Sequence, residues 1–251
     1  MKGINFLDVN QWKPFDWLDN VFFSFNSETI THTWIILLLL FIIGLPIRYF
    51  LKNKSSIGYF LITTSVGSFM ELCEQTLQQS FSYNHFCFIT TIFTFILLCN
   101  SISIIPGMDE PTKDLNTTLA LGIISFLYIQ IYTVKAHGFK EYLKEYLTPF
   151  FLMLPLNIIG KLATIVSISF RLFGNIFGGS IISHIYLHAI QGSLLLETLG
   201  LTLGINLAIL IFFGLFEGFL QAFVFAMLSL TYLSIALQGE AHEDSKIGNV
   251  S

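Results

Sequence analysis

Long apolar runs separated by short polar stretches make up most of the chain. The first three runs cover residues 30–47, 86–108 and 115–134, and none of them contains a charged residue. Two longer apolar tracts follow, at roughly 156–190 and 195–237. About 20 apolar residues in a helix are enough to cross a hydrocarbon core about 30 Å thick. The pattern therefore predicts about five transmembrane helices.

The two long tracts are expected to pair as an antiparallel hairpin over residues 156–237. At a rise of about 1.5 Å per residue, either tract exceeds about 45 Å, which is more than an upright helix needs. Such helices tilt or kink. A Gln-Gly-Ser turn at 191–193 separates them. Glycines on the first tract would allow a neighbouring helix to approach closely; they are Gly174, Gly178 and Gly179.

Three other segments are expected to lie at the membrane surface. Residues 1–29 are mixed polar and aromatic, which fits an interfacial N-terminal segment better than a cleavable signal peptide. Residues 58–79 read as an amphipathic helix, with a full crossing as the alternative that would reverse every later orientation. Alternating lysines and glutamates predict a short surface helix over 139–146. Pro46 marks either the end of the first span or a kink in it.

Positive charges predict the orientation. Cations cluster after the first and third runs and place both loops on the cytoplasmic or matrix side, with the N-terminus outside. The polar tail, residues 240–251, then lies inside. The cations are Arg48, Lys52 and Lys54 in the first cluster and Lys135, Lys140 and Lys144 in the second.

Composition supports this assignment. The 251 residues are 54% hydrophobic and 11% charged, with a mean hydropathy of +0.72. Soluble domains carry about 25% charged residues. The chain is therefore predicted to be a single all-α domain, residues 1–251, embedded in a lipid bilayer. No phosphate-binding loop, catalytic triad or metal-ligand spacing is recognisable, so we expect no catalytic site, cofactor, metal or nucleic-acid partner.

Arg171 is the polar residue that this pattern explains least. It is the only charged residue between Lys161 and Glu197. A charge deep in a membrane span costs several kcal/mol, with estimates from about 3 to above 10. Arginines near helix ends avoid this cost by extending to the headgroups, but Arg171 lies further from a polar loop. It is therefore predicted to face the bundle interior or water.

Further polar residues share the predicted hairpin with Arg171. Ser167 and Asn175 each lie four residues from it, on one helical stripe, while Glu217 and Gln221 are one turn apart on the second helix. An antiparallel hairpin puts Arg171 and Gln221 at similar depth. Each member also has a structural interpretation: Glu217 as a counter-ion for Arg171, and Asn175 and Gln221 as interhelical hydrogen-bond partners.

The outer end of the first long helix carries Ser180 and two histidines. His184 alone is more typical of a hydrogen-bonded packing residue than of a proton relay. His184 and His188 are spaced like metal ligands, but no third ligand follows in the sequence, so a metal site is not expected.

Several motifs resemble subunit a of the F-type ATP synthase. They are Arg-Leu-Phe-Gly-Asn at 171–175, Leu-Gln-Ala-Phe-Val-Phe at 220–225, Tyr-Leu at 232–233 and Pro-Thr-Lys-Asp-Leu-Asn-Thr-Thr-Leu at 111–119. The resemblance covers roughly residues 100–236. It implies a rotary-motor stator whose two long helices pack against a ring of c subunits. Two offset aqueous half-channels would then carry protons to and from the ring carboxylates.

The resemblance also implies residue roles and partners. Arg171 matches the essential arginine, which attracts a deprotonated ring carboxylate and blocks a direct proton leak. Ser167, Asn175, Gln221 and Asn116 fall on positions that are polar in the family. Implied partners are the c-ring, b-type subunits of the peripheral stalk and other ATP synthase membrane subunits. The implied location is a bacterial plasma membrane or a mitochondrial inner membrane.

Two positions depart from the family pattern. Ser180 stands nine residues after the arginine, where relatives carry glutamate or histidine, and Gly214 stands seven residues before the glutamine, where histidine or glutamate is common. Glu217 is then the candidate inlet carboxylate, and His184 the candidate replacement for the other partner.

Two functions outside this family remain open from the sequence. A secondary transporter could use Arg171 to bind an anionic substrate, although no inverted repeat is visible. A structural membrane subunit could hold Arg171 and Glu217 as a buried pair.

Overall fold

The computed structural model describes residues 11–12, 25–52, 56–102, 105, 108, 110–140, 142–143, 154–190, 198 and 204–238. Its long helices are α1 (Ser27–Lys52), α2 (Ile57–Leu77), α3 (Tyr83–Ser101), α4 (Leu115–His137), α6 (Leu154–Ile190) and α9 (Gly218–Gln238). Short elements are α8 (Ile205–Ile209), the 3-10 turns η2 (Gln78–Ser80) and η4 (Pro111–Lys113), and the π-helix η6 (Leu210–Glu217), which continues into α9. Strands β1 (Gln11–Trp12) and β2 (Phe25–Asn26) form a two-residue antiparallel pair.

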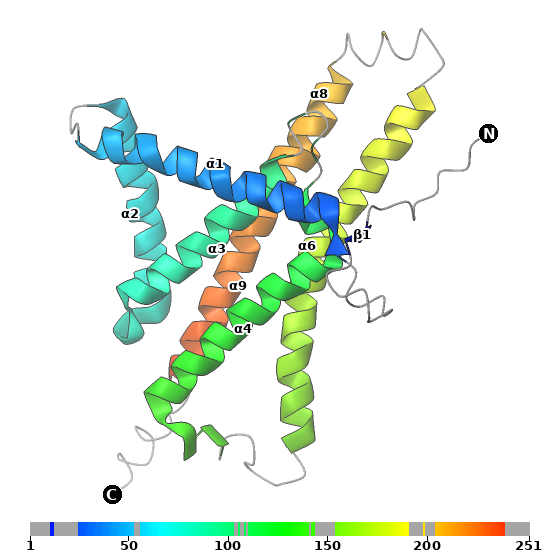
Figure 1. Cartoon of the computed structure of the whole chain (residues 1–251). Coiled ribbons are helices and arrows are strands. Elements are labelled where there is room, and N and C mark those ends of the chain that lie inside the picture. The colour runs from blue at the N-terminus through cyan, green and yellow to red at the C-terminus, as the bar shows by residue number, and fades with distance from the viewer. Residues whose placement is uncertain are drawn as a thin grey trace, which may run out of the picture.

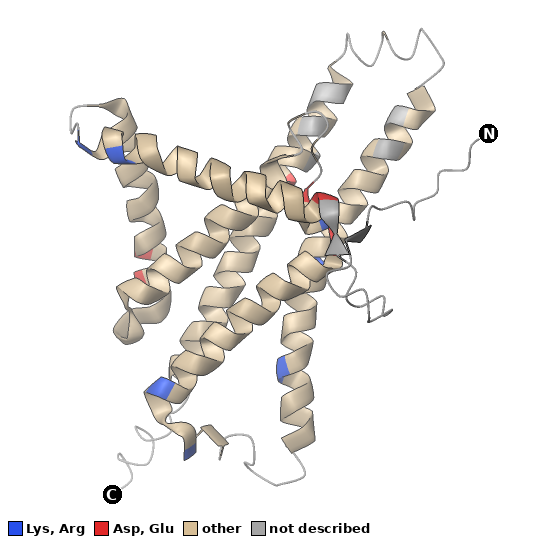
Figure 2. Ribbon diagram, in the orientation of Figure 1, with Lys and Arg blue, Asp and Glu red and all other residues tan. Residues whose placement is uncertain are grey.

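Five of these helices are long and apolar enough to cross a membrane, as the sequence predicts. Within the described residues they cover 28–52, 83–101, 115–137, 154–190 and 214–238. The helix α2 is not among them by length and hydropathy, and its expected place at the membrane surface stays a prediction. Charged residues gather near helix ends and loops, and long middle stretches of the helices carry none (Figure 2).

Capping residues fix several helix boundaries. Ser56 and Ser82 accept hydrogen bonds from backbone N–H groups in the first turns of α2 and α3, at 3.3 and 3.4 Å. The Asp114 carboxylate accepts from the Asn116 N–H at 3.0 Å and so begins α4. Gly138, with φ of 85°, ends α4 by donating to the Val134 carbonyl, a conformation that glycine adopts without strain.

Some predicted boundaries differ from the structure. Pro46 lies inside α1, which continues to Lys52, so it does not end the first span. The second span ends at Ser101 rather than at residue 108. Helical residues occur at 139, 140, 142 and 143 of the predicted surface helix, and its other residues lie outside the described part. The turn at 191–193 and the tail at 240–251 also lie outside it.

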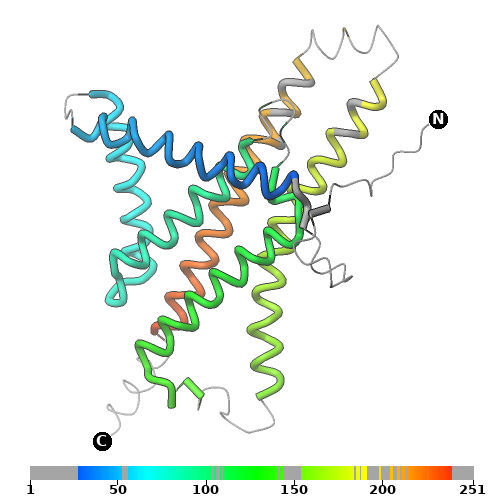
Figure 3. The backbone as a smooth tube through the Cα atoms, viewed as in Figure 1, coloured from blue at the N-terminus to red at the C-terminus, as the bar shows by residue number. Residues whose placement is uncertain are grey.

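Helix α9 is the centre of the bundle. It packs against α3, α4, α2 and α6, and α6 runs antiparallel to it (Figure 1). Helix α1 crosses the upper part of α3 and leads into the α2–α3 hairpin at one side of the molecule (Figure 3). The core between α3, α4, α6 and α9 is built from Ile92, Ile96, Leu121, Ile168, Leu172, Ile176, Ala222 and Phe225.

Buried polar contacts fix how α9 sits against its neighbours. Ser125 on α4 donates to Ser229 on α9 at 2.8 Å, and Ser234 donates to the Thr76 carbonyl of α2 at 2.7 Å. Hydrogen bonds of this kind hold helices together in lipid, where apolar surfaces alone give little preference. The helix that carries Gln221 is therefore fixed from two sides.

Candidate ion path

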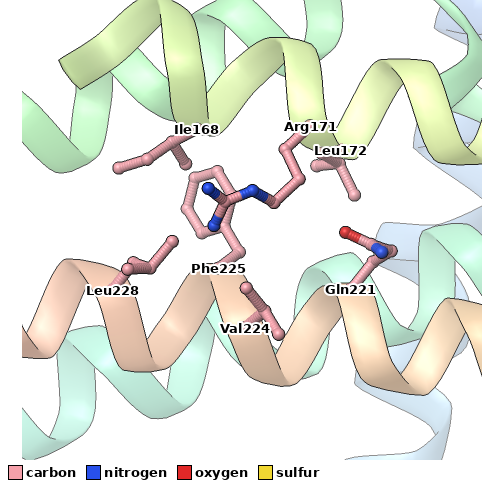
Figure 4. A pocket seen from close by; sticks show the side chains of 7 residues that line it. All are labelled: Ile168, Arg171, Leu172, Gln221, Val224, Phe225 and Leu228. Carbon is pink, nitrogen blue, oxygen red and sulfur yellow. The ribbon is translucent and has the colours of Figure 1, made fainter.

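A small open cleft lies between α6 and α9, near the middle of both helices (Figure 4). Arg171 reaches into it from α6 and Gln221 from α9, and they are its polar lining residues. The sequence places these two side chains at similar depth, and the structure brings them together. The remaining lining residues are apolar: Ile168, Leu172, Val224, Phe225 and Leu228.

Arg171 occupies the open side of α6. The next residue, Leu172, is 1% exposed and packs into the core. This packing fixes the rotation of α6 about its axis, so Arg171 lies on the outer face. Among the described residues, no carboxylate lies within salt-bridge distance of Arg171. The predicted counter-ion pair with Glu217 is therefore not formed in the structure.

The polar stripe on α6 lies on an exposed side of the helix, with Arg171 at the border to α9. Ser167 and Asn175 are exposed like Arg171. A Cβ atom added at Gly174 or Gly178 would meet nothing within 4 Å. Within the described chain, no neighbouring helix uses these glycines for close approach. This face carries a guanidinium, an amide and a hydroxyl, and its glycines add no side chains that would project between them.

Glu217 is half-buried at the end of η6, one residue before a close helix contact. Asn100 on α3 is fully buried, and its side-chain N–H donates to the Gly218 carbonyl at 3.0 Å. A Cβ atom added at Gly218 would lie 2.8 Å from the Asn100 Cβ. The glycine is required for this approach, which fixes α9 against α3 beside Glu217.

A second carboxylate lies near Glu217. Glu110, just before η4, is 9% exposed, and its Oε2 is 3.7 Å from the Lys113 Nζ. It lies two residues before Thr112, whose hydroxyl donates to the same Asn100 side chain that bonds to Gly218, the residue after Glu217. Glu110 was not among the residues that the sequence pattern singled out. The signal available was Asn100, an amide inside an otherwise apolar run, because such a residue needs a partner.

The other predicted site residues lie further from the cleft. Ser180 is half-buried on α6, nine residues or about 14 Å along the axis beyond Arg171. His184 belongs to the same helix, and its side chain lies outside the described part. Asn116 is exposed in the first turn of α4 and does not line the cleft. In the part of the chain that is described, no three His, Cys, Asp or Glu residues form a metal-binding group.

Comparison with known proteins assigns this arrangement to a family. The sequence pattern of the family described as ATP synthase A chain matches residues 30–234. The chain belongs to the ATP synthase A chain family. The match begins at residue 30, so it includes the first span, to which the sequence motifs alone gave almost no weight.

Individual relatives agree with this assignment. The chain is 32% identical over 233 residues to ATP synthase subunit a 2 of Acaryochloris marina, covering 91% of this chain and 93% of the relative. It is 34% identical over 215 residues to ATP synthase subunit a 2 of Picosynechococcus sp., covering 84% and 85%. The subunit a of Geobacter sulfurreducens is 33% identical over 165 residues, covering 64% and 71%.

Family and fold together give the location. Five apolar helices make this member of the ATP synthase A chain family an integral, multi-pass membrane protein. The relatives above come from bacteria. Of the two membranes that the sequence left open, the bacterial plasma membrane is therefore the one supported.

Proposed function

We propose that this chain is the proton-conducting stator subunit of an F-type ATP synthase and that the open face of α6 packs against a ring of c subunits. One observation carries the proposal. Arg171 lies in an apolar spanning helix, on a face open to the outside of the bundle, without a described carboxylate in salt-bridge distance. A charge left so in lipid is costly. A ring carboxylate arriving from outside the chain would supply the missing negative charge.

Arg171 acts as the barrier between two half-channels. A guanidinium does not lose its proton in proteins, so it remains a fixed positive charge. A ring carboxylate beside it is held deprotonated, because an opposite charge favours the ionised form. Protons cannot pass Arg171 directly and must travel on the ring. Gln221, across the cleft, offers an amide that can hold the guanidinium in place.

The path on the outer side starts at the carboxylates. Glu217 lies one turn, or about 6 Å along the axis, from Gln221, and Glu110 is linked to the same region through Thr112 and Asn100. A carboxylate that accepts and releases a proton can pass it to a ring site. On α6, Asn175 lies one turn outward of Arg171 and Ser167 one turn inward, which places one polar residue beside each half-channel. Further out, Ser180 and His184 extend the outer path.

The chain itself carries no catalytic site in this proposal. It converts proton flow into ring rotation, and the chemistry of ATP takes place in other subunits. Holding the stator against the turning ring requires b-type subunits of the peripheral stalk and further membrane subunits. Membership of the ATP synthase A chain family, together with the open arginine face, supports this role.

Cross-linking tests which face meets the ring. In a Cys87→Ser background, which removes the exposed native thiol, Asn175→Cys is labelled with a maleimide photo-cross-linker and illuminated in membranes. We expect a product that contains a c subunit, in a complex that purifies with ATPase activity. The matched control is Leu38→Cys on α1, 62% exposed and outside the cleft, which should give no ring product.

Other outcomes separate the alternatives. Purification of the chain without a ring and without ATPase activity would contradict the proposal, and substrate-anion binding lost in Arg171→Ala would then favour a secondary transporter. If the chain purifies with the ATPase and proton conduction is unchanged in Arg171→Ala, the result would favour a purely structural role for the chain.

A further inference from the structure

Asn100 connects three parts of the molecule at the level of Glu217. Its side-chain N–H donates to the Gly218 carbonyl of α9, and its Oδ1 accepts from the Thr112 hydroxyl of η4 at 2.8 Å. Asn100 and Thr112 are both 0% exposed. A carboxamide can donate and accept in fixed directions, so this one side chain sets the position of α3, α9 and η4 relative to one another.

The bond to Gly218 acts next to Glu217. Gly218 is the first residue of α9 after the π-helix η6, of which Glu217 is the last residue. Segments of π-helix are rare and often occur at functional sites. Glu217 thus stands where the π-helix η6 meets the α-helix α9, and the backbone geometry of this junction sets the direction of its side chain. An additional hydrogen bond from another helix fixes the backbone at that junction.

The bond to Thr112 acts next to Glu110. Glu110 precedes η4 directly, and Lys113 at the end of η4 contacts its carboxylate at 3.7 Å. Moving Thr112 would therefore move Glu110 as well. The two carboxylates lie on segments more than 100 residues apart in sequence, and a single buried amide joins the segments that carry them.

We infer that Asn100 is a positioning residue for proton transfer, whose carboxamide holds Glu110 and Glu217 in a fixed arrangement on the outer path. The inference rests on the proposed function, because it matters only if Glu217 carries protons. Proton transfer requires groups within hydrogen-bond reach, directly or through one water. A misplacement near 1 Å can cost as much as about 100-fold in rate.

Thr112→Val tests the inference with a change of nearly equal shape. The variant removes the hydroxyl that Asn100 accepts from and leaves Glu110, Glu217 and Arg171 unchanged. We expect passive proton conduction through membranes stripped of the catalytic head to fall about tenfold per assembled complex, with a shifted pH profile. Thr112→Ser keeps the hydroxyl and should restore conduction. Asn100→Asp, which loses the donor to Gly218, should reproduce the loss by an independent change.

Ser125→Ala is the matched structural control. It removes a buried hydrogen bond between α4 and α9 of the same 2.8 Å length, whose α9 partner Ser229 lies eleven residues from Gly218. Since conduction is counted per assembled complex, a purely structural role predicts equal effects in both variants. We expect Ser125→Ala to stay within about twofold of wild type.

Glu217→Gln, measured in parallel, separates failure of the inference from failure of the proposed function. Blocked conduction in Glu217→Gln with normal conduction in Thr112→Val and Asn100→Asp would overturn the positioning role of Asn100 and leave the proton path intact. An equal loss in Ser125→Ala and Thr112→Val would also overturn it. Normal conduction in Glu217→Gln would remove Glu217 from the path and with it the basis of the inference.

Discussion

Arg171 on α6 and Gln221 on α9 line one cleft from opposite sides, and the other residues of its wall are apolar. The two side chains come from helices that run antiparallel, and the Arg171 guanidinium points along the cleft toward Ile168 and Leu228 while the Gln221 amide lies at its other end (Figure 4). A guanidinium and an amide are the polar groups in a wall that is otherwise apolar. Substitutions at either residue therefore test the polar content of this wall directly.

Gln221→Leu should slow coupling without abolishing it. The leucine keeps the cleft filled but removes the amide that we propose holds the guanidinium of Arg171, and a hydrogen bond to a charged group contributes roughly 1.5–3 kcal/mol. We expect ATP-driven proton pumping in vesicles to fall by roughly fivefold or more. Val224→Ala, in the same wall, should change pumping far less. Wild-type pumping in Gln221→Leu would mean that α6 and α9 do not face each other as described.

Arg171→Lys should abolish ATP synthesis, as should Arg171→Ala. A desolvated ammonium can lose its proton, and lysine then no longer provides a fixed charge. The measurement is ATP synthesis by membrane vesicles under an imposed proton gradient. Lys161→Arg, at the other cation of α6, is the control and should retain synthesis. A lysine variant working near the wild-type rate would refute the barrier role.

Glu217→Gln should strongly reduce passive proton conduction in both directions, because the amide cannot take up and release a proton. Introducing a carboxylate further out on α6, in the double variant Glu217→Gln with Ser180→Glu, should partly restore it, since position 180 lies on the same proposed path. Conduction is measured in membranes stripped of the catalytic head. Absence of any restoration would argue that Glu217 stabilises its surroundings and does not carry protons.

Gly218→Ala should destabilise the bundle. The added Cβ would lie 2.8 Å from the Asn100 Cβ, and crowding of this kind in a packed core costs typically about 1–3 kcal/mol. Gly44→Ala in α1, where a Cβ meets nothing within 4 Å, should be neutral or slightly stabilising, because alanine favours helix. Thermal unfolding of the purified complex in detergent compares the two. Equal midpoints would contradict the close approach of α3 and α9.

Hydropathy predicted the spans because lipid offers the backbone no hydrogen-bond partners. In lipid every N–H and C=O must be satisfied internally, so an apolar run of sufficient length becomes a helix. Helical spacing then placed Ser167, Arg171 and Asn175 on one stripe, and the structure has all three on the open face of α6. Local periodicity was sufficient for these features.

The contacts of Asn100 could not be predicted in this way. Its bond to Gly218 joins residues 118 positions apart, and no local pattern selects one distant partner over another. Glu110 was missed for the same reason, because its place beside this network depends on the bond between Thr112 of η4 and Asn100 of α3. The assumption of a regular α-helix also failed over residues 210–217, where the structure has a π-helix.

The π-helix has a consequence for how side chains are aimed. A turn of π-helix holds more residues than a turn of α-helix. The side chains of α8 are therefore rotated about the helix axis relative to the positions that an unbroken α-helix leading into α9 would give them. Gain or loss of one residue within 210–217 would turn everything before it by about 100°, while Gln221 stayed opposite Arg171. Position 214, counted back from Gln221, therefore does not point where the same count along a straight α-helix would point. An insertion or deletion within 210–217 can thus change the direction of the side chains before the π-helix, while those around Gln221 keep theirs and no residue type is changed.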